Sequence, residues 1–147
     1  MIDPLVVDID TSTIIAAATA SRDWTAFHHD PVAARAAGMR DIILNTPAHM
    51  AFVSRWLTSS VAESGRIRRL TLQLRSSVYP GDRMTISGRT LPGTHATAVS
   101  FESSVQGKTL ARGTGVVQSC DRCDPWAIPL EQWALSDDPG VPLRESD

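Results

Sequence analysis

The stretch NTPAHMAFVSRWLTSSV, residues 45–61, places apolar side chains along one side of a helix. The repeat runs at spacings of three and four residues through Met50, Val53, Leu57 and Val61. This spacing predicts one long, well buried helix over 48–61. Asn45 or Thr46 can provide the N-cap oxygen, and Pro47 suits the first helical position because no N–H is needed there.

The chain on either side of this helix predicts strands and shorter helices. Apolar and polar residues alternate through most of 67–117. Turn residues separate the expected strands at three places: 78–82, 92–93 and 107. Upstream we expect one strand and two helices: 5–9, 14–20 and 32–37. A long helix followed by a strand meander favours an α+β fold in which an antiparallel sheet covers the helix.

Length and charge limit the classes of protein to consider. The 147 residues suit a single domain, which we place at 1–135, with an irregular tail at 136–147. A formal net charge of −2 and a pI near 6.0 argue against nucleic acid as a partner. No apolar run approaches the roughly 20 residues that cross a bilayer, and the acidic N-terminus is unlike a secretory signal. We therefore expect a cytoplasmic protein.

The segment 23–31, DWTAFHHDP, gathers two histidines and two aspartates between apolar side chains. An acid and an imidazole held against an apolar wall can act as a proton-transfer pair, because burial and mutual hydrogen bonding tune both groups. A polar turn is the alternative interpretation. In that case an aspartate caps the backbone, the histidines lie on the surface, and Asp30-Pro31 opens a helix. On local chemistry alone, the polar turn is the favoured interpretation.

The order of several motifs resembles that of the MaoC-like family of (R)-specific enoyl-CoA hydratases and dehydratases. The resemblance covers roughly 5–118 and rests on Asp23, His28, Asp30, Pro31, Ala34, Gly38, Ile42 and the Pro80-Gly81-Asp82 turn. It implies a single hot-dog domain, in which an antiparallel sheet wraps a long central helix. It also implies a lyase of lipid metabolism that hydrates or dehydrates an acyl-CoA thioester and uses no cofactor besides that substrate.

By this resemblance, Asp23 and His28 hold the reacting water between them and share the proton transfers. The enolate oxygen that forms on the thioester needs hydrogen-bond donors, and the N-terminus of the long helix favours negative charge. Because Pro47 has no N–H, we expect the backbone N–H of Thr46 or Ala48 to be the donor. The side-chain amide of Asn45 is a supplementary donor.

One position departs from the family pattern. Many members have His-Gly where this chain has Asn45-Thr46. The stretch 40–45 looks more like small actinobacterial subunits of the family, some of which act on steroid-side-chain CoA thioesters, and several of those work with a second hot-dog chain. We therefore expect a homodimer or a heteromer, with bulky or steroid-like acyl groups among the substrates. A non-catalytic subunit of a heteromeric hydratase and a hot-dog thioesterase are the alternatives.

The remaining polar residues carry weaker arguments. The main basic concentration follows the long helix: Arg66, Arg68, Arg69 and Arg75. It is either a solvated strand end or a contact for CoA phosphates. We expect surface, packing and turn positions, respectively, for three histidines: His29, His49 and His95. Cys120 and Cys123 form a lone Cys-x-x-Cys that cannot fill a tetrahedral zinc site, so we expect reduced thiols and no metal.

Overall fold

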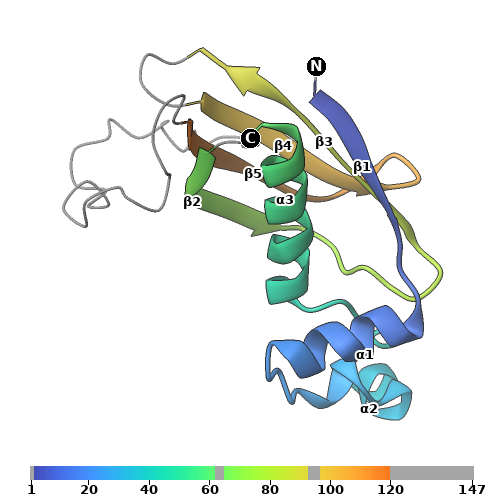
Figure 1. Ribbon diagram of the computed structural model, residues 1–147. Coiled ribbons are helices and arrows are strands. Elements are labelled where there is room, and N and C mark those ends of the chain that lie inside the picture. The colour runs from blue at the N-terminus through green and yellow to red at the C-terminus, as the bar shows by residue number, and fades with distance from the viewer. Residues whose placement is uncertain (1, 62–64, 93–96, 120–147) are drawn as a thin grey trace.

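The computed structural model describes residues 2–61, 65–92 and 97–119 (Figure 1). In chain order the elements are β1 Ile2–Asp8, α1 Thr11–Ala20, the 3₁₀ helix η1 Ala26–His28, α2 Pro31–Ala36, α3 Thr46–Ser60, β2 Gly65–Leu74, β3 Arg83–Leu91, β4 Thr97–Val105 and β5 Lys108–Ser119. The expectations for His95, Cys120, Cys123, the domain end at 135 and the tail fall outside the described residues. None of the described helices is long and apolar enough to span a bilayer.

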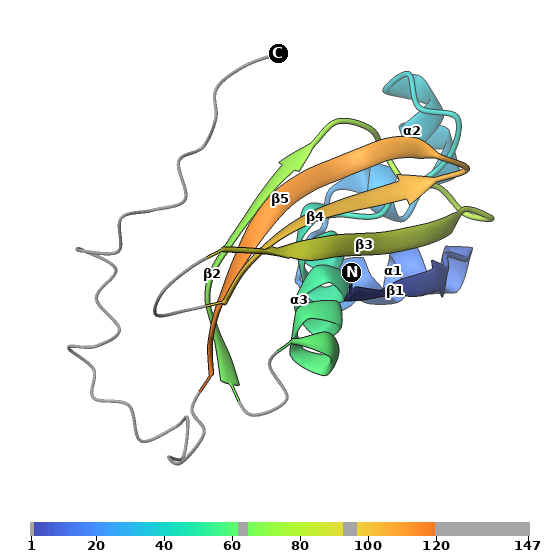
Figure 2. The same cartoon turned by 90° about the horizontal axis from the view of Figure 1, so that it is seen from above.

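The described strands form one five-stranded antiparallel sheet in the order β1-β3-β4-β5-β2. Figure 2 shows this sheet curving around α3, which lies on its concave side. In the register, Leu5 faces Ile86 between β1 and β3, and Phe101 faces Gly113 between β4 and β5. The arrangement confirms the predicted α+β class and the hot-dog fold.

Helix α3 is anchored to the sheet by the buried side chains of Val53, Trp56 and Leu57. The Trp56 indole N–H donates to the Asp3 carbonyl oxygen at 2.8 Å and so ties the helix to β1. Gly88 of β3 lies against the same ring, since a Cβ at this position would come within 2.6 Å of it. A residue without a side chain therefore lets helix and sheet approach closely.

The ends and one face of α3 differ from the prediction. Asn45 is the N-cap, as one of the two expected candidates, and the helix runs from Thr46 to Ser60 rather than over 48–61. The predicted apolar stripe is wrong at Met50, which is 36% exposed. The buried row passes through His49 instead, because His49 precedes Val53 by four residues and so shares its face.

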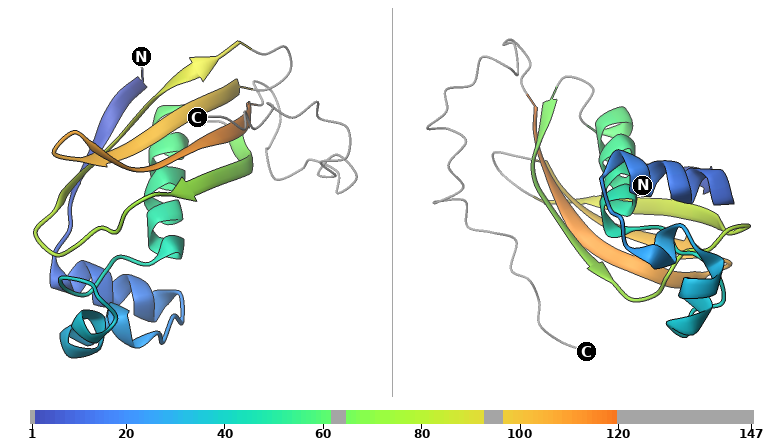
Figure 3. Two further views of the ribbon diagram at one scale, coloured as in Figure 1. Left: turned by 180° about the vertical axis from the view of Figure 1, so that it is seen from behind. Right: turned by 90° about the horizontal axis from the view of Figure 1, so that it is seen from below.

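The short helices lie together beside the N-terminal end of α3 (Figures 1 and 3). Carboxylates cap both α1 and α2. Asp10 accepts the Thr13 N–H at 2.6 Å, and Asp30 accepts the Val32 N–H at 2.7 Å. Gly38, with a φ of +84°, allows the chain to turn after α2 and run towards α3. These caps and turns place the loop after α1 next to the first turn of α3.

Candidate active site

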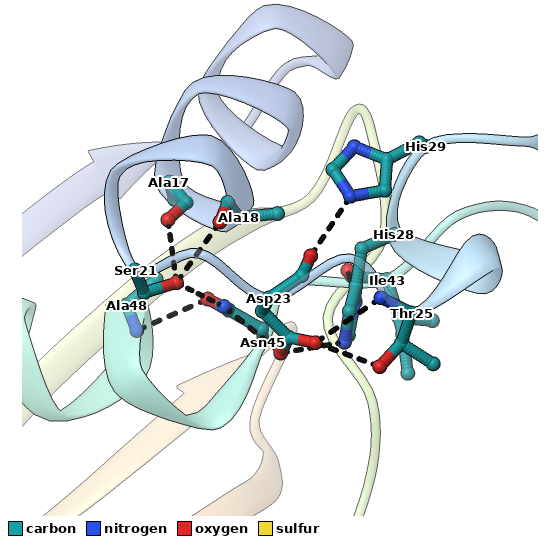
Figure 4. A network of polar contacts seen from close by, with 10 residues as sticks. All are labelled: Ala17, Ala18, Ser21, Asp23, Thr25, His28, His29, Ile43, Asn45 and Ala48. Carbon is teal, nitrogen blue, oxygen red and sulfur yellow. Dashed lines mark hydrogen bonds and ion pairs between the residues drawn. The ribbon is translucent and has the colours of Figure 1, made fainter.

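Three polar side chains from separate segments meet at the first turn of α3 (Figure 4). Asp23 follows α1, His28 belongs to η1, and Asn45 caps α3. The Nε2 atom of His28 lies 3.2 Å from Oδ2 of Asp23. His28 is 5% exposed, whereas the side chain of Asp23 is 25% exposed. The structure thus places the acid and the imidazole singled out in the sequence in direct contact.

Two neighbours fix the imidazole of His28. Its Nδ1 atom lies 2.7 Å from the carbonyl oxygen of Ile43. A carbonyl oxygen can only accept a hydrogen bond, so Nδ1 carries a proton. The ring of Phe27 packs edge-on against the imidazole, with 4.6 Å between the ring centroids. His28 therefore presents Nε2 towards Asp23 as the nitrogen available for proton transfer.

Hydrogen bonds orient the Asp23 carboxylate and favour its ionised form. The Thr25 hydroxyl donates to Oδ1 at 2.7 Å, and the Asn45 amide donates to Oδ2 at 3.2 Å. The Thr25 hydroxyl is the main cause that lowers the pKa of Asp23 below its ordinary value. The Asn45 amide and His28 act in the same direction, while desolvation of the carboxylate opposes them. The carboxylate is therefore ionised near neutral pH.

Asn45 connects the end of α1 to the start of α3, and only 2% of it is exposed. Its amide nitrogen donates to Ser21 Oγ at 2.7 Å as well as to Asp23. Its side-chain oxygen accepts the Ala48 N–H at 3.1 Å. Both amide hydrogens and the oxygen are thus engaged within the protein. This geometry does not favour the expected role of the amide as a supplementary donor to substrate; the amide positions Asp23 instead.

The backbone N–H groups in the first turn of α3 differ in what they can offer a ligand. Pro47 has none. The Ala48 N–H donates to the Asn45 side chain, and the His49 N–H donates to the Asn45 carbonyl oxygen at 3.1 Å. Within the described residues, the Thr46 N–H has no acceptor. Of the two donors that the sequence proposed, the geometry therefore favours Thr46.

A cavity of about 490 Å³ opens beside these groups, and we call it the candidate cavity. Asp23 and His28 line it from the loop after α1, and Thr46 and His49 line it from α3. Residues 74–78, at the end of β2 and just beyond it, complete the lining from the sheet side. The volume is of the size that takes a small-molecule group. The acid–imidazole pair and Thr46 therefore line the same cavity, which is partly open to solvent.

The basic residues are divided between this cavity and the other half of β2. Arg75 lines the candidate cavity. Arg66, Arg68 and Arg69 do not line it, and Arg66 pairs in the sheet with Gln118 near the end of β5. Their contact with CoA phosphates stays a prediction, and Arg75 is a basic residue placed closer to the acid–imidazole pair.

His29 supports the loop from outside the cavity. Its Nε2 atom lies 2.8 Å from the backbone carbonyl oxygen of Asp23. Its ring stacks on the exposed Trp24, with 6.1 Å between the ring centroids. These contacts place His29 at the rim of the loop, apart from the atoms that would meet a substrate.

Sequence reasoning missed two hydroxyl residues of this network. Thr25 lies two residues after Asp23, a spacing at which aspartate side chains often bond the following backbone, so a local signal was present. Ser21 gave no such signal, because its partner Asn45 lies 24 residues further along the chain.

The comparison with known families points to the same family as the motifs and the fold. The family model described as MaoC like domain matches residues 5–114. The chain therefore belongs to the MaoC-like family of hot-dog hydratases and dehydratases, as the resemblance of its motifs implied.

One curated relative and two solved structures are similar to this chain. The chain is 34% identical over 79 residues to the 3-oxo-4,17-pregnadiene-20-carboxyl-CoA hydratase beta subunit of Mycobacterium tuberculosis. That match covers 54% of this chain and 61% of the relative, less than two thirds of its length. One chain in the crystal structure of the ChsH1-ChsH2 complex from the same organism superposes on this chain with a TM-score of 0.77 and 25% identity. The match covers 80% of this chain and 94% of that chain of the complex. An (R)-hydratase from A. caviae involved in PHA biosynthesis shares the fold, with a TM-score of 0.75 and 18% identity over 82% and 95% of the two chains.

Proposed function

We propose that this chain hydrates an enoyl-CoA thioester and, in reverse, dehydrates the corresponding 3-hydroxyacyl-CoA. One observation carries the proposal. The Asp23–His28 pair, with 3.2 Å between Oδ2 and Nε2, lines the same cavity as Thr46 at the start of α3. Hydration needs a base for water, a proton for Cα and a donor for the enolate oxygen, and these three residues supply them.

In the hydration direction, water binds beside the pair and contacts both the Asp23 carboxylate and Nε2 of His28. Its oxygen adds to Cβ while one of its protons passes to the pair, and the pair delivers a proton to Cα. The negative charge that develops on the thioester oxygen is stabilised by the Thr46 N–H and by the positive end of the helix dipole. One water is added across the double bond, and the pair returns to its starting protonation state.

The substrate class is inferred from the relatives and from the cavity. The relative with 34% identity is named as a hydratase of a pregnadiene carboxyl-CoA. We infer that this chain likewise acts on CoA thioesters with bulky acyl groups, including steroid-like ones. Arg75, which lines the cavity, provides positive charge on the path of the CoA moiety.

The same relatives support a heteromeric assembly. One of them is a beta subunit, and one of the similar structures is a complex of ChsH1 with ChsH2. In the described part of this chain, β1 and β2 are the edges of the sheet, and edge strands offer backbone groups to a second sheet. We propose a second hot-dog chain as the partner, with a homodimer as the alternative.

Substitutions within the pair test the catalytic assignment. Asp23→Asn removes the proton acceptor and His28→Ala removes Nε2, so each is expected to lower turnover by about 10²–10⁴-fold with the fold intact. His29→Ala is the matched control and should stay within about threefold of the parent. The assay follows loss of the conjugated enoyl-thioester absorbance, with the chain alone and with its partner chain added.

The possible outcomes separate the alternatives. Near-normal turnover in His28→Ala contradicts the acid–base assignment. Activity that requires a partner and ignores both substitutions identifies this chain as a non-catalytic subunit. Release of free CoA with the double bond unchanged identifies a thioesterase. A crystal soaked with a saturated acyl-CoA checks the oxyanion site, where the carbonyl oxygen should lie about 2.7–3.1 Å from the Thr46 nitrogen.

A further inference from the structure

The candidate cavity contains a buried polar pair that the proposed acid–base chemistry does not use. His49 of α3 is 2% exposed and Ser103 of β4 is fully buried. Nε2 of His49 lies 2.7 Å from Oγ of Ser103, so the pair bridges the helix and the sheet. The His49 ring also lines the candidate cavity. The pair is therefore at once part of the core and part of the ligand-facing wall.

The hydrogen-bonding capacity of His49 is only partly used. Burial lowers the pKa of its imidazole to about 4, so the ring is neutral near pH 7 and has one donor and one acceptor nitrogen. The contact with Ser103 occupies Nε2. Among the described residues, Nδ1 has no hydrogen-bond partner. Nδ1 is not shielded from the cavity, so a ligand that displaces water there without offering a hydrogen bond leaves this polar atom unpaired.

His49 lies next to Thr46, the residue whose N–H is proposed to bind the thioester oxygen. Thr46 and His49 are three residues apart and lie on the same face of α3, about 4.5 Å apart along the helix axis. The same face of α3 continues into the core with two apolar side chains, Val53 and Trp56. A thioester bound at Thr46 would therefore direct its acyl chain past His49. A purely hydrocarbon chain would cover Nδ1 without a hydrogen bond, and a chain with an oxygen function would satisfy it.

We propose that the His49–Ser103 pair is a specificity-determining site that binds a hydroxyl or carbonyl oxygen on the acyl group, beyond C3. This inference rests on the proposed function, since it assumes that an acyl-CoA occupies the cavity. It deepens that function by assigning a substrate class: acyl-CoA thioesters whose acyl group carries a hydrogen-bonding oxygen substituent.

Binding of unreactive ligands tests the proposal without reference to turnover. The probes are octanoyl-CoA and its analogues with one hydroxyl at carbon 5, 6, 7 or 8, titrated into the full chain by calorimetry, with the partner chain where it is needed. We expect at least one hydroxylated probe to bind about tenfold more tightly than octanoyl-CoA, the effect of one well placed hydrogen bond. Equal binding of all five probes within about twofold overturns the inference.

A double substitution assigns the preference to the pair. His49→Leu with Ser103→Ala removes both polar partners together and so leaves no orphaned group in the core. The ratio of the affinities for the hydroxylated probe and for octanoyl-CoA should fall to about one, whatever the change in the affinity for octanoyl-CoA itself. Persistence of the preference overturns the assignment. His49→Met with Ser103→Ala serves as a second variant, because the flexible methionine adapts to the site if leucine prevents folding. Failure of the parent protein to bind any acyl-CoA contradicts the proposed function itself, a result distinct from binding without discrimination.

Discussion

Asn45 performs two tasks with one side chain. Its oxygen caps α3 through the Ala48 N–H, and its amide group bonds both Ser21 and the catalytic candidate Asp23. The side chain of Asn45 therefore ties the start of the helix to the acid. The cap contributes stability, and the amide contributes the orientation of the carboxylate, so the two roles are separable by substitution.

Asn45→Ala removes both roles. We expect the free energy of unfolding to fall by about 1–3 kcal/mol, from the lost cap and the unpaired Ser21 contact. We expect kcat to fall by about tenfold or more with little change in KM, because the Asp23 carboxylate loses a donor that orients it. Asn45→Ser is the matched variant: serine keeps the cap but cannot reach Asp23, so stability should recover more than kcat. Equal recovery of both quantities would mean that Asn45 acts only on stability.

The buried imidazole of His49 makes the stability of the fold depend on pH. Its pKa is lowered from 6.5 to about 4 in the folded protein. The unfolded chain therefore binds more protons than the folded protein between these values, and stability is present above pH 6.5 and lost as the pH falls towards 4. The loss between pH 7 and pH 5 should be about 2 kcal/mol.

Urea unfolding at the two pH values measures this effect. His49→Gln places a side-chain amide near Ser103 that cannot titrate. Between pH 7 and pH 5 this variant should therefore lose about 2 kcal/mol less stability than the parent. If the parent and the variant lose stability equally, His49 is not the group responsible.

Residue-level prediction from the sequence succeeded where the signal was local. The pairing of Asp23 with His28 and the cap at Asn45 follow from short spacings and from a resemblance of motifs, and the structure places these three side chains in contact. The occupied N–H of Ala48 follows once Asn45, and not Thr46, is the cap, because a cap side chain accepts the N–H of the second or third helical residue and Pro47 has none. The packing position expected for His49 is confirmed, but its bond to Ser103 was not predictable, because the two residues lie 54 positions apart in the chain.

At the scale of elements, the position of α3 depends on a close approach to β3. A Cβ added at Gly88 would lie 2.3 Å from the Ser100 carbonyl oxygen and 2.6 Å from the Trp56 ring. The carbonyl belongs to the paired strand β4 and cannot move freely, so the contact cannot be relieved by a rotamer change alone. This glycine therefore fixes how near the helix lies to the sheet that lines the cavity.

Gly88→Ala should lower the free energy of unfolding by about 1–3 kcal/mol, the usual range for overpacking a core. Ser87→Ala is the control, since its exposed side chain points away from the helix and its effect should be within about 0.5 kcal/mol. Both are measured by urea unfolding at pH 7. A Gly88→Ala protein as stable as the control variant would show that the helix shifts without strain.

The helices and strands were easier to predict than the contacts between them. Alternation predicted the strands and a three-and-four repeat predicted α3, because each pattern reports burial on one face. The ends of α3 were displaced by one or two residues, since frayed turns carry little periodic signal. No pattern in the sequence predicts that residues 74–78 line the cavity opposite Asp23, because that contact depends on the curvature of the whole sheet.

At the scale of the whole molecule, the open edges of the sheet are where we expect a partner chain to pair. The outer strands of the described sheet are β1 and β2. Each exposes one large apolar side chain to the same extent: Val6 on β1 and Leu74 on β2 are both 43% exposed. Leu74 also lines the candidate cavity, whereas Val6 does not. A partner that pairs with β2 would therefore both protect an apolar edge and close the cavity.

We expect the protein to form a dimer or a dimer of dimers, of one or two kinds of chain, through the β2 edge, with the site completed across the interface. Leu74→Glu places a charge in that contact and should dissociate the assembly and lower activity together. Val6→Glu, an equally exposed position on the opposite edge, should leave both nearly unchanged. Sedimentation at micromolar concentration reports the mass against 15.9 kDa for one chain. A stable, active particle of one chain contradicts the assembly, and dissociation by Val6→Glu alone would move the interface to β1, away from the cavity.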